Sequence, residues 1–103
     1  MTRANPHRGE ASLTVAGETI VLRPSFSALV AAEQELGSLF ALVERAAAGG
    51  LLLGEIAALF DHLSSARPQA ITRERIGDAI VDQGIAKVTP VLRLLLGQIL
   101  SGR

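Results

Sequence analysis

The sequence contains no cysteine, tryptophan or tyrosine, and only three phenylalanines among its 103 residues. Without cysteine there is neither a disulfide framework nor thiolate chemistry, which fits a protein of the reducing cytoplasm. Without Trp and Tyr, the chain lacks the stacking platforms typical of single-strand nucleic-acid binders. Two histidines and no cysteine also leave little for a zinc site.

An excess of charge of one sign is absent, and so is a long apolar run. Ten basic residues balance ten acidic ones, whereas a nucleic-acid-binding domain normally carries a basic excess or stripe. No apolar run approaches the ~20 residues of a membrane span. The opening residues lack the apolar segment of a signal peptide. We therefore expect no nucleic-acid partner, no membrane partner and a cytoplasmic location.

The residues that are present indicate one globular domain over residues 1–103, because a chain of this length has room for one core. Apolar residues make up 49% and charged residues 19%, a globular rather than a disordered composition. Since aromatic residues are scarce, the core must consist of Leu, Ile, Val and Ala. Such a core suits closely packed helices.

Hydrophobic periodicity predicts an α+β, mostly helical fold, with an N-terminal β-hairpin packed on four or five short helices. Residues 1–9 predict a flexible arm. Residues 12–23 predict the hairpin, with strands over 12–16 and 19–23 around a Gly17-Glu18 turn. The helical part spans 26–101, with Ser25, Ser38 and Thr72 as N-caps. Its helices are expected over 26–36, 39–48, 54–65, from Thr72 to Gly84, and over 85–100.

Pro90 leaves two alternatives open for the last helix. Proline lacks the amide N–H and its ring clashes with the preceding turn, so a continuous helix would be kinked there. Thr89-Pro90 also fits an N-cap followed by the first helical position, which would start the helix at Thr89. The apolar stripe continues unbroken through the proline, which favours the kinked helix.

The sharpest single residue is Glu33, because the helical period places it at the centre of an apolar face. A carboxylate there needs a partner or becomes protonated. Arg23 and the amides near Ser38 are the candidate partners in a purely structural role. Alternatively, the whole face binds another protein. Its members are Phe26, Leu29, Val30, Leu36 and Phe40, with Glu33 at the centre.

The last helix is apolar on more than one side and carries no acidic residue. Such a helix is either buried in the core or awaits a partner, and self-association into a homo-oligomer is one form of the second alternative. Its candidate partner-binding residues are Leu92, Leu95, Leu96 and Ile99.

No set of residues predicts catalysis, a cofactor or a metal, so we do not expect an enzyme. Asp61, His62, Ser64 and Ser65 include the residue types of a catalytic triad, but neighbours on one helix point apart instead of converging. Three acidic residues at i, i+4 and i+8 form a stripe that is either solvated or docks a basic partner. They are Glu74, Asp78 and Asp82.

The N-terminal third carries an ordered set of short motifs: an Arg-Gly-Glu opening, a Gly-centred hairpin, Leu-Arg, a Phe-x-Ala-Leu helix start, a later Glu and a final Leu-Gly. These are Arg8, Gly9, Glu10, Gly17, Leu22, Arg23, Phe26, Ala28, Leu29, Glu33, Leu36 and Gly37. Their order and spacing resemble the tail assembly chaperones of gene transfer agents and siphophages. The likeness covers residues 6–37 and continues more loosely through Gly84-Ile85-Ala86 to the end.

The resemblance implies a non-enzymatic chaperone, in a bacterial cell that produces phage-like particles. Its expected partners are the tape-measure protein, the tail-tube protein or both, held by helix-in-groove contact before the particle is complete. Two alternatives stay open. One is a structural tail or head–tail component retained in the particle, and the other is a host helical adaptor protein.

Overall fold

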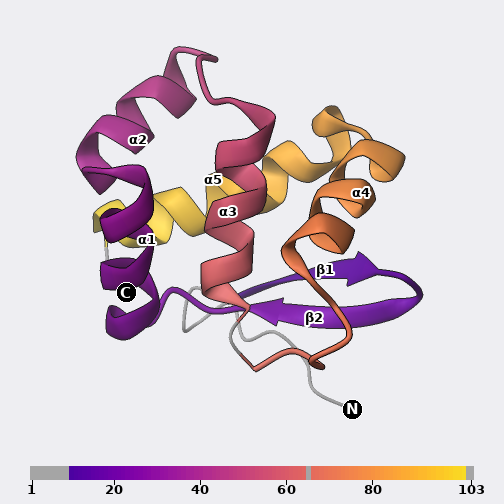
Figure 1. The fold of residues 1–103 in the computed structure, drawn as a ribbon. Coiled ribbons are helices and arrows are strands. Elements are labelled where there is room, and N and C mark those ends of the chain that lie inside the picture. The colour runs from indigo at the N-terminus through magenta and orange to yellow at the C-terminus, as the bar shows by residue number, and fades with distance from the viewer. Residues whose placement is uncertain (1–9, 65, 102–103) are drawn as a thin grey trace.

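The computed structural model describes residues 10–64 and 66–101, and within them the chain forms two strands and five helices (Figure 1). The expected α+β, mostly helical fold is confirmed, and the expected arm at residues 1–9 lies outside the described residues. The elements are β1 (Ala11–Val15), β2 (Glu18–Leu22), α1 (Phe26–Leu36), α2 (Leu39–Ala47), α3 (Leu53–Leu63), α4 (Arg73–Gln83) and α5 (Ile85–Ser101).

The hairpin is antiparallel, and Val15 pairs with Glu18 across a two-residue turn. Both turn residues, Ala16 and Gly17, have positive φ angles of 52° and 81°, as a type I′ turn requires. The expected strands were therefore placed one residue too far along the chain, because Ala16 belongs to the turn and Glu18 to β2. Alternate residues of β1 face the core, as the period of two predicts.

The predicted N-caps are confirmed: the side-chain oxygens of Ser25, Ser38 and Thr72 each accept a hydrogen bond from the amide three residues ahead at 3.3 Å. The third helix ends at Leu63, two residues earlier than expected. Leu52, at the N-cap position before this helix, is exposed.

The last helix runs from Ile85 to Ser101 with Pro90 inside it, so it does not start at Thr89. The Thr89 hydroxyl donates a 2.7 Å hydrogen bond back to the Ile85 carbonyl. Gly84, at φ 91°, separates this helix from α4, and the two axes differ by 119°.

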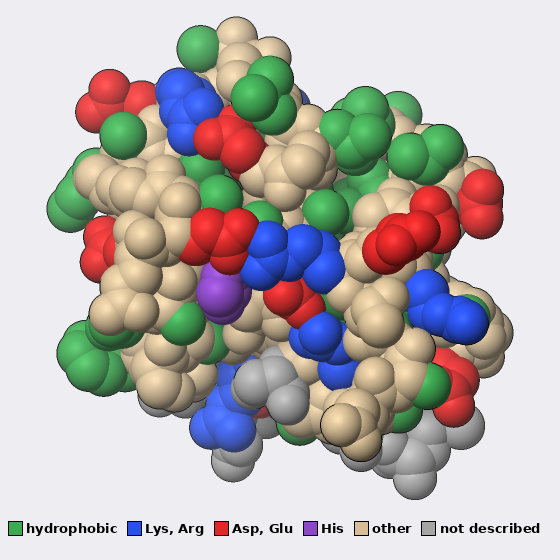
Figure 2. Space-filling view, viewed as in Figure 1, with side chains coloured by type: hydrophobic (Ala, Val, Ile, Leu, Met, Phe, Trp, Pro, Cys, Tyr) green, Lys and Arg blue, Asp and Glu red, His purple; other side chains and the backbone are tan. Residues whose placement is uncertain are grey.

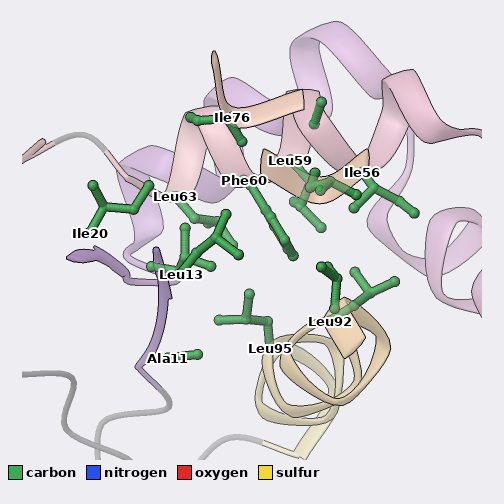
Figure 3. Packing of buried hydrophobic residues seen from close by; sticks show 14 of the residues in the cluster. Ala11, Leu13, Ile20, Ile56, Leu59, Phe60, Leu63, Ile76, Leu92 and Leu95 are labelled. Atoms are coloured by element: carbon green, nitrogen blue, oxygen red, sulfur yellow. The ribbon is translucent and has the colours of Figure 1, made fainter. Parts of the chain in front are cut away.

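The third helix lies at the centre, with α1 and α4 packed against it, while the hairpin packs on α3, α4 and α5 (Figure 1). Phe60 is fully buried and points from α3 toward Leu92 and Leu95 of α5 (Figure 3). One cluster of apolar side chains from all seven elements fills this space. Besides Phe60, its members are the Leu, Ile, Val and Ala residues that the composition predicts.

Candidate functional site

Helix α1 buries two alanines and leaves two larger apolar residues outside. Ala28 and Ala32 are buried against the core, whereas Phe26 is 84% exposed and Val30 also faces solvent. Phe26, Val30 and Glu33 follow one another at helical spacing, so they form one stripe on the side away from the alanines. The apolar face predicted for α1 is therefore centred on the outward side of the helix.

The other predicted members of this face divide between the edge of the core and the surface. Leu29 and Leu36 are half-buried and pack against the core. Phe40, at the start of α2, is 73% exposed. We call Phe26, Val30 and Phe40 the outer apolar residues. Phe26 and Val30 are neighbours at i and i+4 of α1, and exposed apolar side chains that adjoin one another indicate a partner more often than scattered ones do.

Glu33 is exposed, and its Oε2 accepts a hydrogen bond from the amide of Leu39 at 3.2 Å. One of the two structural partners considered for it, an amide near Ser38, is thus observed. Arg23, the other candidate, lies 3.6 Å (Nε to Oε2) from Glu10 instead. Because Glu33 serves the first turn of α2, it fixes the junction of α1 and α2 on which Phe40 lies.

The leucines predicted as partner-binding on the last helix lie in the core. Leu92, Leu95 and Leu96 are buried, and Ile99 is half-buried against the same cluster. Of the two alternatives for this helix, core burial is therefore the one observed for the three leucines. The reason is that α5 packs on β1 and α4, which takes up its most apolar side.

A second side of α5 is open and forms one wall of an apolar groove of about 600 Å³. Ile56, Leu92 and Leu96, all buried residues, form its floor. The groove is about four times the ~150 Å³ cavity that accommodates benzene, so it has room for several side chains of that size. Its full lining is Val43, Ala46, Ala47, Gly49, Leu51, Ile56, Ile85, Thr89, Leu92, Arg93, Leu96, Gly97 and Leu100.

The opposite wall is α2, held in place by a bidentate ion pair. Arg45 of α2 donates to both carboxylate oxygens of Glu55 on α3, at 2.9 and 2.6 Å. Glu55 also accepts from the amide of Leu52 at 2.9 Å. The Arg45 hydrogen bonds, followed by that amide, lower the pKa of Glu55. This ion pair therefore joins α2, one wall of the groove, to α3.

A network of charges links α1, α3 and α4, and sequence reasoning did not predict it. Arg73 binds Glu35 through Nη1 and Nη2 at 2.5 and 2.8 Å and donates from Nε to Asp61 at 2.9 Å. His62 Nε2 lies 2.8 Å from Glu35 Oε1, and Arg67 pairs with Asp61. Figure 2 shows acidic and basic side chains alternating, with a histidine beside them, across this face.

The network shifts the ionisation of its members. The hydrogen bonds from Arg73, and next the one with His62, lower the pKa of Glu35 to about 2 from its ordinary 4.5. The Glu35 contact raises the pKa of Arg73, so its guanidinium stays charged. An adjoining hollow of about 540 Å³ is lined in part by Ser27, His62 and Arg67.

The triad residue types are engaged in structural contacts. Asp61 and His62 belong to the charge network, and the Ser64 hydroxyl is buried and donates to the Phe60 carbonyl at 2.7 Å. Ser65 lies outside the described residues. Glu74, Asp78 and Asp82 are exposed along α4. Within residues 10–64 and 66–101, no group of three or more His, Asp or Glu side chains is placed to hold a metal ion.

A family model described as "Phage tail tube protein, GTA-gp10" matches residues 8–102. The chain belongs to this family. The match begins at Arg8, the first residue of the N-terminal motif set, and covers all seven elements of the fold. The resemblance to tail proteins of phages and gene transfer agents is therefore confirmed at the level of the tail family. No curated protein and no solved structure matches the chain.

For this tail family member, the described residues contain no single helix long and apolar enough to cross a membrane. Two bent pairs, α1 with α2 and α4 with α5, reach that length only together and turn by 76° and 119°. The surfaces that stand out are the outer apolar residues and the α2–α5 groove. Both offer contact area rather than reactive groups.

Proposed function

We propose that this chain is a tail assembly chaperone, which covers apolar surface of a tape-measure protein, a tail-tube protein or both until the tail is complete. It acts without catalysis, in the cytoplasm of the cell that makes the particles. Membership of a phage-type tail family supports a role in a phage-like tail. The observation that carries the proposal is the inverted burial of α1, which packs alanines inward and leaves Phe26 and Val30 outside.

The energetics suit a contact that forms and is later released. Burying a phenylalanine gains about 1.5–3 kcal/mol, so Phe26 and Phe40 together supply about 3–6 kcal/mol before the cost of association. Association and side-chain ordering take up much of this gain. The net affinity expected from these two anchors alone is weak, in the range of about a millimolar dissociation constant or weaker. Additional contacts, such as the α2–α5 groove, are needed for micromolar capture.

A second candidate is a structural component that stays in the particle, and the family's description as a tail tube protein favours it. In that case neighbouring subunits would add to the hairpin, whose two-stranded sheet has edges available for pairing. The strands have only five residues each, so such an edge offers few hydrogen bonds. Edge pairing of the hairpin leaves the exposure of the outer apolar residues, which belong to α1 and α2, without an explanation.

Purified particles distinguish the two candidates. We expect the chain in lysates of producing cells but absent, or far below the copy number of tube subunits, in mature particles by quantitative mass spectrometry. A stoichiometric presence in washed tails would contradict the chaperone proposal and support the structural candidate.

Co-expression tests the proposed contact directly. We expect the chain to increase the soluble fraction of the tape-measure protein from the same particle, and the Phe26→Ser, Phe40→Ser double variant to lose most of this effect. Glu44→Ser, an exposed position of α2, is the matched control and should behave as wild type. If the double variant retains the full effect while circular dichroism shows a normal fold, the outer apolar residues are not the contact.

A further inference from the structure

We propose that the α2–α5 groove binds an amphipathic helix whose apolar face is flanked by acidic residues. This rests on the proposed function only in assigning the helix to a tail protein. Helix α5 contributes Ile85, Thr89, Leu92, Leu96 and Leu100 to the groove. Their spacing places them on one side of the helix, so the groove follows the axis of α5.

The dimensions of the groove fit a helix rather than a compact ligand. From Ile85 to Leu100 the axis of α5 rises about 22 Å at 1.5 Å per residue. Ile85 and Leu100, at its two ends, are 56% and 55% exposed, whereas the floor is buried. An elongated apolar trough with open ends accepts side chains at i, i+3, i+4 and i+7 of a helix laid along it.

Gly97 allows a close approach midway along this trough. A Cβ atom at Gly97 would meet no heavy atom within 4 Å, so the space above it is open. On the opposite wall, Ala46 and Ala47 also have small side chains. Small residues on facing helices let another backbone come near, which helix packing at short axial distance requires.

The charge on the groove selects the occupant. Arg93 is exposed and is the one charged residue among the described residues that line the groove. Helix α5 has no acidic residue between Ile85 and Ser101, so the α5 of a second copy laid in the groove would bring Arg93 near Arg93. A helix with Glu or Asp beside its leucines instead gives Arg93 a partner at the rim. Because the whole chain has zero formal net charge, a preference for acid must come from this local site.

Two designed peptides test the inference without the natural client. Each has leucine at positions a and d over three heptads, about 21 residues, with glutamate at e and g in one and lysine in the other. In fluorescence anisotropy at low salt, we expect the glutamate peptide to bind at least about threefold more tightly, the size expected for an exposed ion pair. Arg93→Glu should reverse that order, and added salt should reduce it.

Gly97→Phe fills the groove from its wall and should lower the affinity for the glutamate peptide at least about tenfold. The fold should survive, because glycine is a poorer helix former than most residues and the site is open. Gly54→Phe places the same side chain in α3, where a Cβ likewise meets nothing within 4 Å, outside the groove. It should bind the peptide as wild type does.

The inference is overturned if the two peptides bind with equal affinity or if neither binds. It is also overturned if Gly97→Phe binds the glutamate peptide as tightly as the wild type does. So would a concentration-dependent dimer that Gly97→Phe dissociates, since a second copy would then occupy the groove. Co-expression separates this from the proposed function. If Gly97→Phe still solubilises the tape-measure protein, the groove is not the site, but the chaperone proposal stands. If the wild type does not increase the solubility of the tape-measure protein but still binds the glutamate peptide, only the chaperone proposal is contradicted.

Discussion

Arg73 on α4 holds Glu35 on α1 through two parallel hydrogen bonds, from Nη1 to Oε2 at 2.5 Å and from Nη2 to Oε1 at 2.8 Å. The two residues are 38 positions apart, and the Nε of the same guanidinium binds Asp61 on the intervening α3. One arginine therefore joins three helices. A bidentate arginine–carboxylate contact of this kind fixes orientation as well as distance.

Glu35→Gln should make the free energy of unfolding depend less on pH between about pH 4.5 and pH 2. Since the pKa of Glu35 is lowered to about 2 from 4.5, its contribution is fully present above about pH 4.5 and is lost as the pH falls toward 2. Thermal melts from pH 7 to pH 2 should show the wild type more stable at neutral pH, with the difference from Glu35→Gln disappearing near pH 2. High salt should shrink the difference, because the pair is partly exposed.

Glu44→Gln provides the control, because Glu44 is exposed on α2, away from this network. Its melting curve should follow that of the wild type at every pH. A constant offset between wild type and Glu35→Gln from pH 7 to pH 2 would contradict the ionic origin of the contribution and would indicate a packing effect instead.

Features set by a few neighbouring residues could be predicted from the sequence, whereas the charge network could not. Ser25, Ser38 and Thr72 each accept a hydrogen bond from the amide three residues ahead, so a few neighbouring residues of the sequence are enough to predict each N-cap. The Glu35–Arg73 pair depends on α1 and α4 both packing on α3. No local pattern contains that information.

The side of α1 that faces the core could not be predicted from the sequence either. Hydrophobicity alone favours burial of Phe26 and Val30, yet Ala28 and Ala32 are the buried residues. The separation of packed helices depends on the side chains between them, so alanines let α1 lie close to α3. Because the alanines face the core, Phe26 and Val30 lie on the surface, where they form part of the candidate site.

Phe60→Ala should lower the free energy of unfolding by about 3–5 kcal/mol, while Phe26→Ala should change it by less than about 0.5 kcal/mol. The chemistry is the same at both positions, but Phe60 is fully buried and Phe26 is 84% exposed. Urea titrations measure both. A large loss for Phe26→Ala would mean that this side chain stabilises the fold, and its proposed role in client binding would lose its basis.

Ala16→Gly should stabilise the protein by roughly 0.5–1 kcal/mol, because an L-residue pays about 1–2 kcal/mol in the left-handed region and glycine's extra backbone entropy offsets part of this. Ala16 has a φ of 52° in the hairpin turn. Ala48→Gly is the matched control: its φ of −84° is ordinary, so the same substitution should destabilise. Urea midpoints that move in the same direction for both variants would contradict the strain assigned to Ala16.

Pro90→Ala tests whether the last helix is truly continuous. Inside a helix, proline costs about 3 kcal/mol relative to alanine. Its restriction of the unfolded chain returns about 0.4–1 kcal/mol. Since Pro90 lies six residues into α5, Pro90→Ala should raise the free energy of unfolding by about 2 kcal/mol, measured by urea titration.

Pro68→Ala is the control and should change stability in the opposite direction to Pro90→Ala. The reason is that Pro68 lies in the connection before α4, outside any helix. There the substitution removes only the restriction of the unfolded chain, so it should destabilise by up to about 1 kcal/mol. If Pro90→Ala also destabilises, Pro90 occupies the first turn of a helix that starts at Thr89, where proline is favourable. Ile85 would then not belong to the helix, and the α2–α5 groove would lose the end of the wall that Ile85 forms.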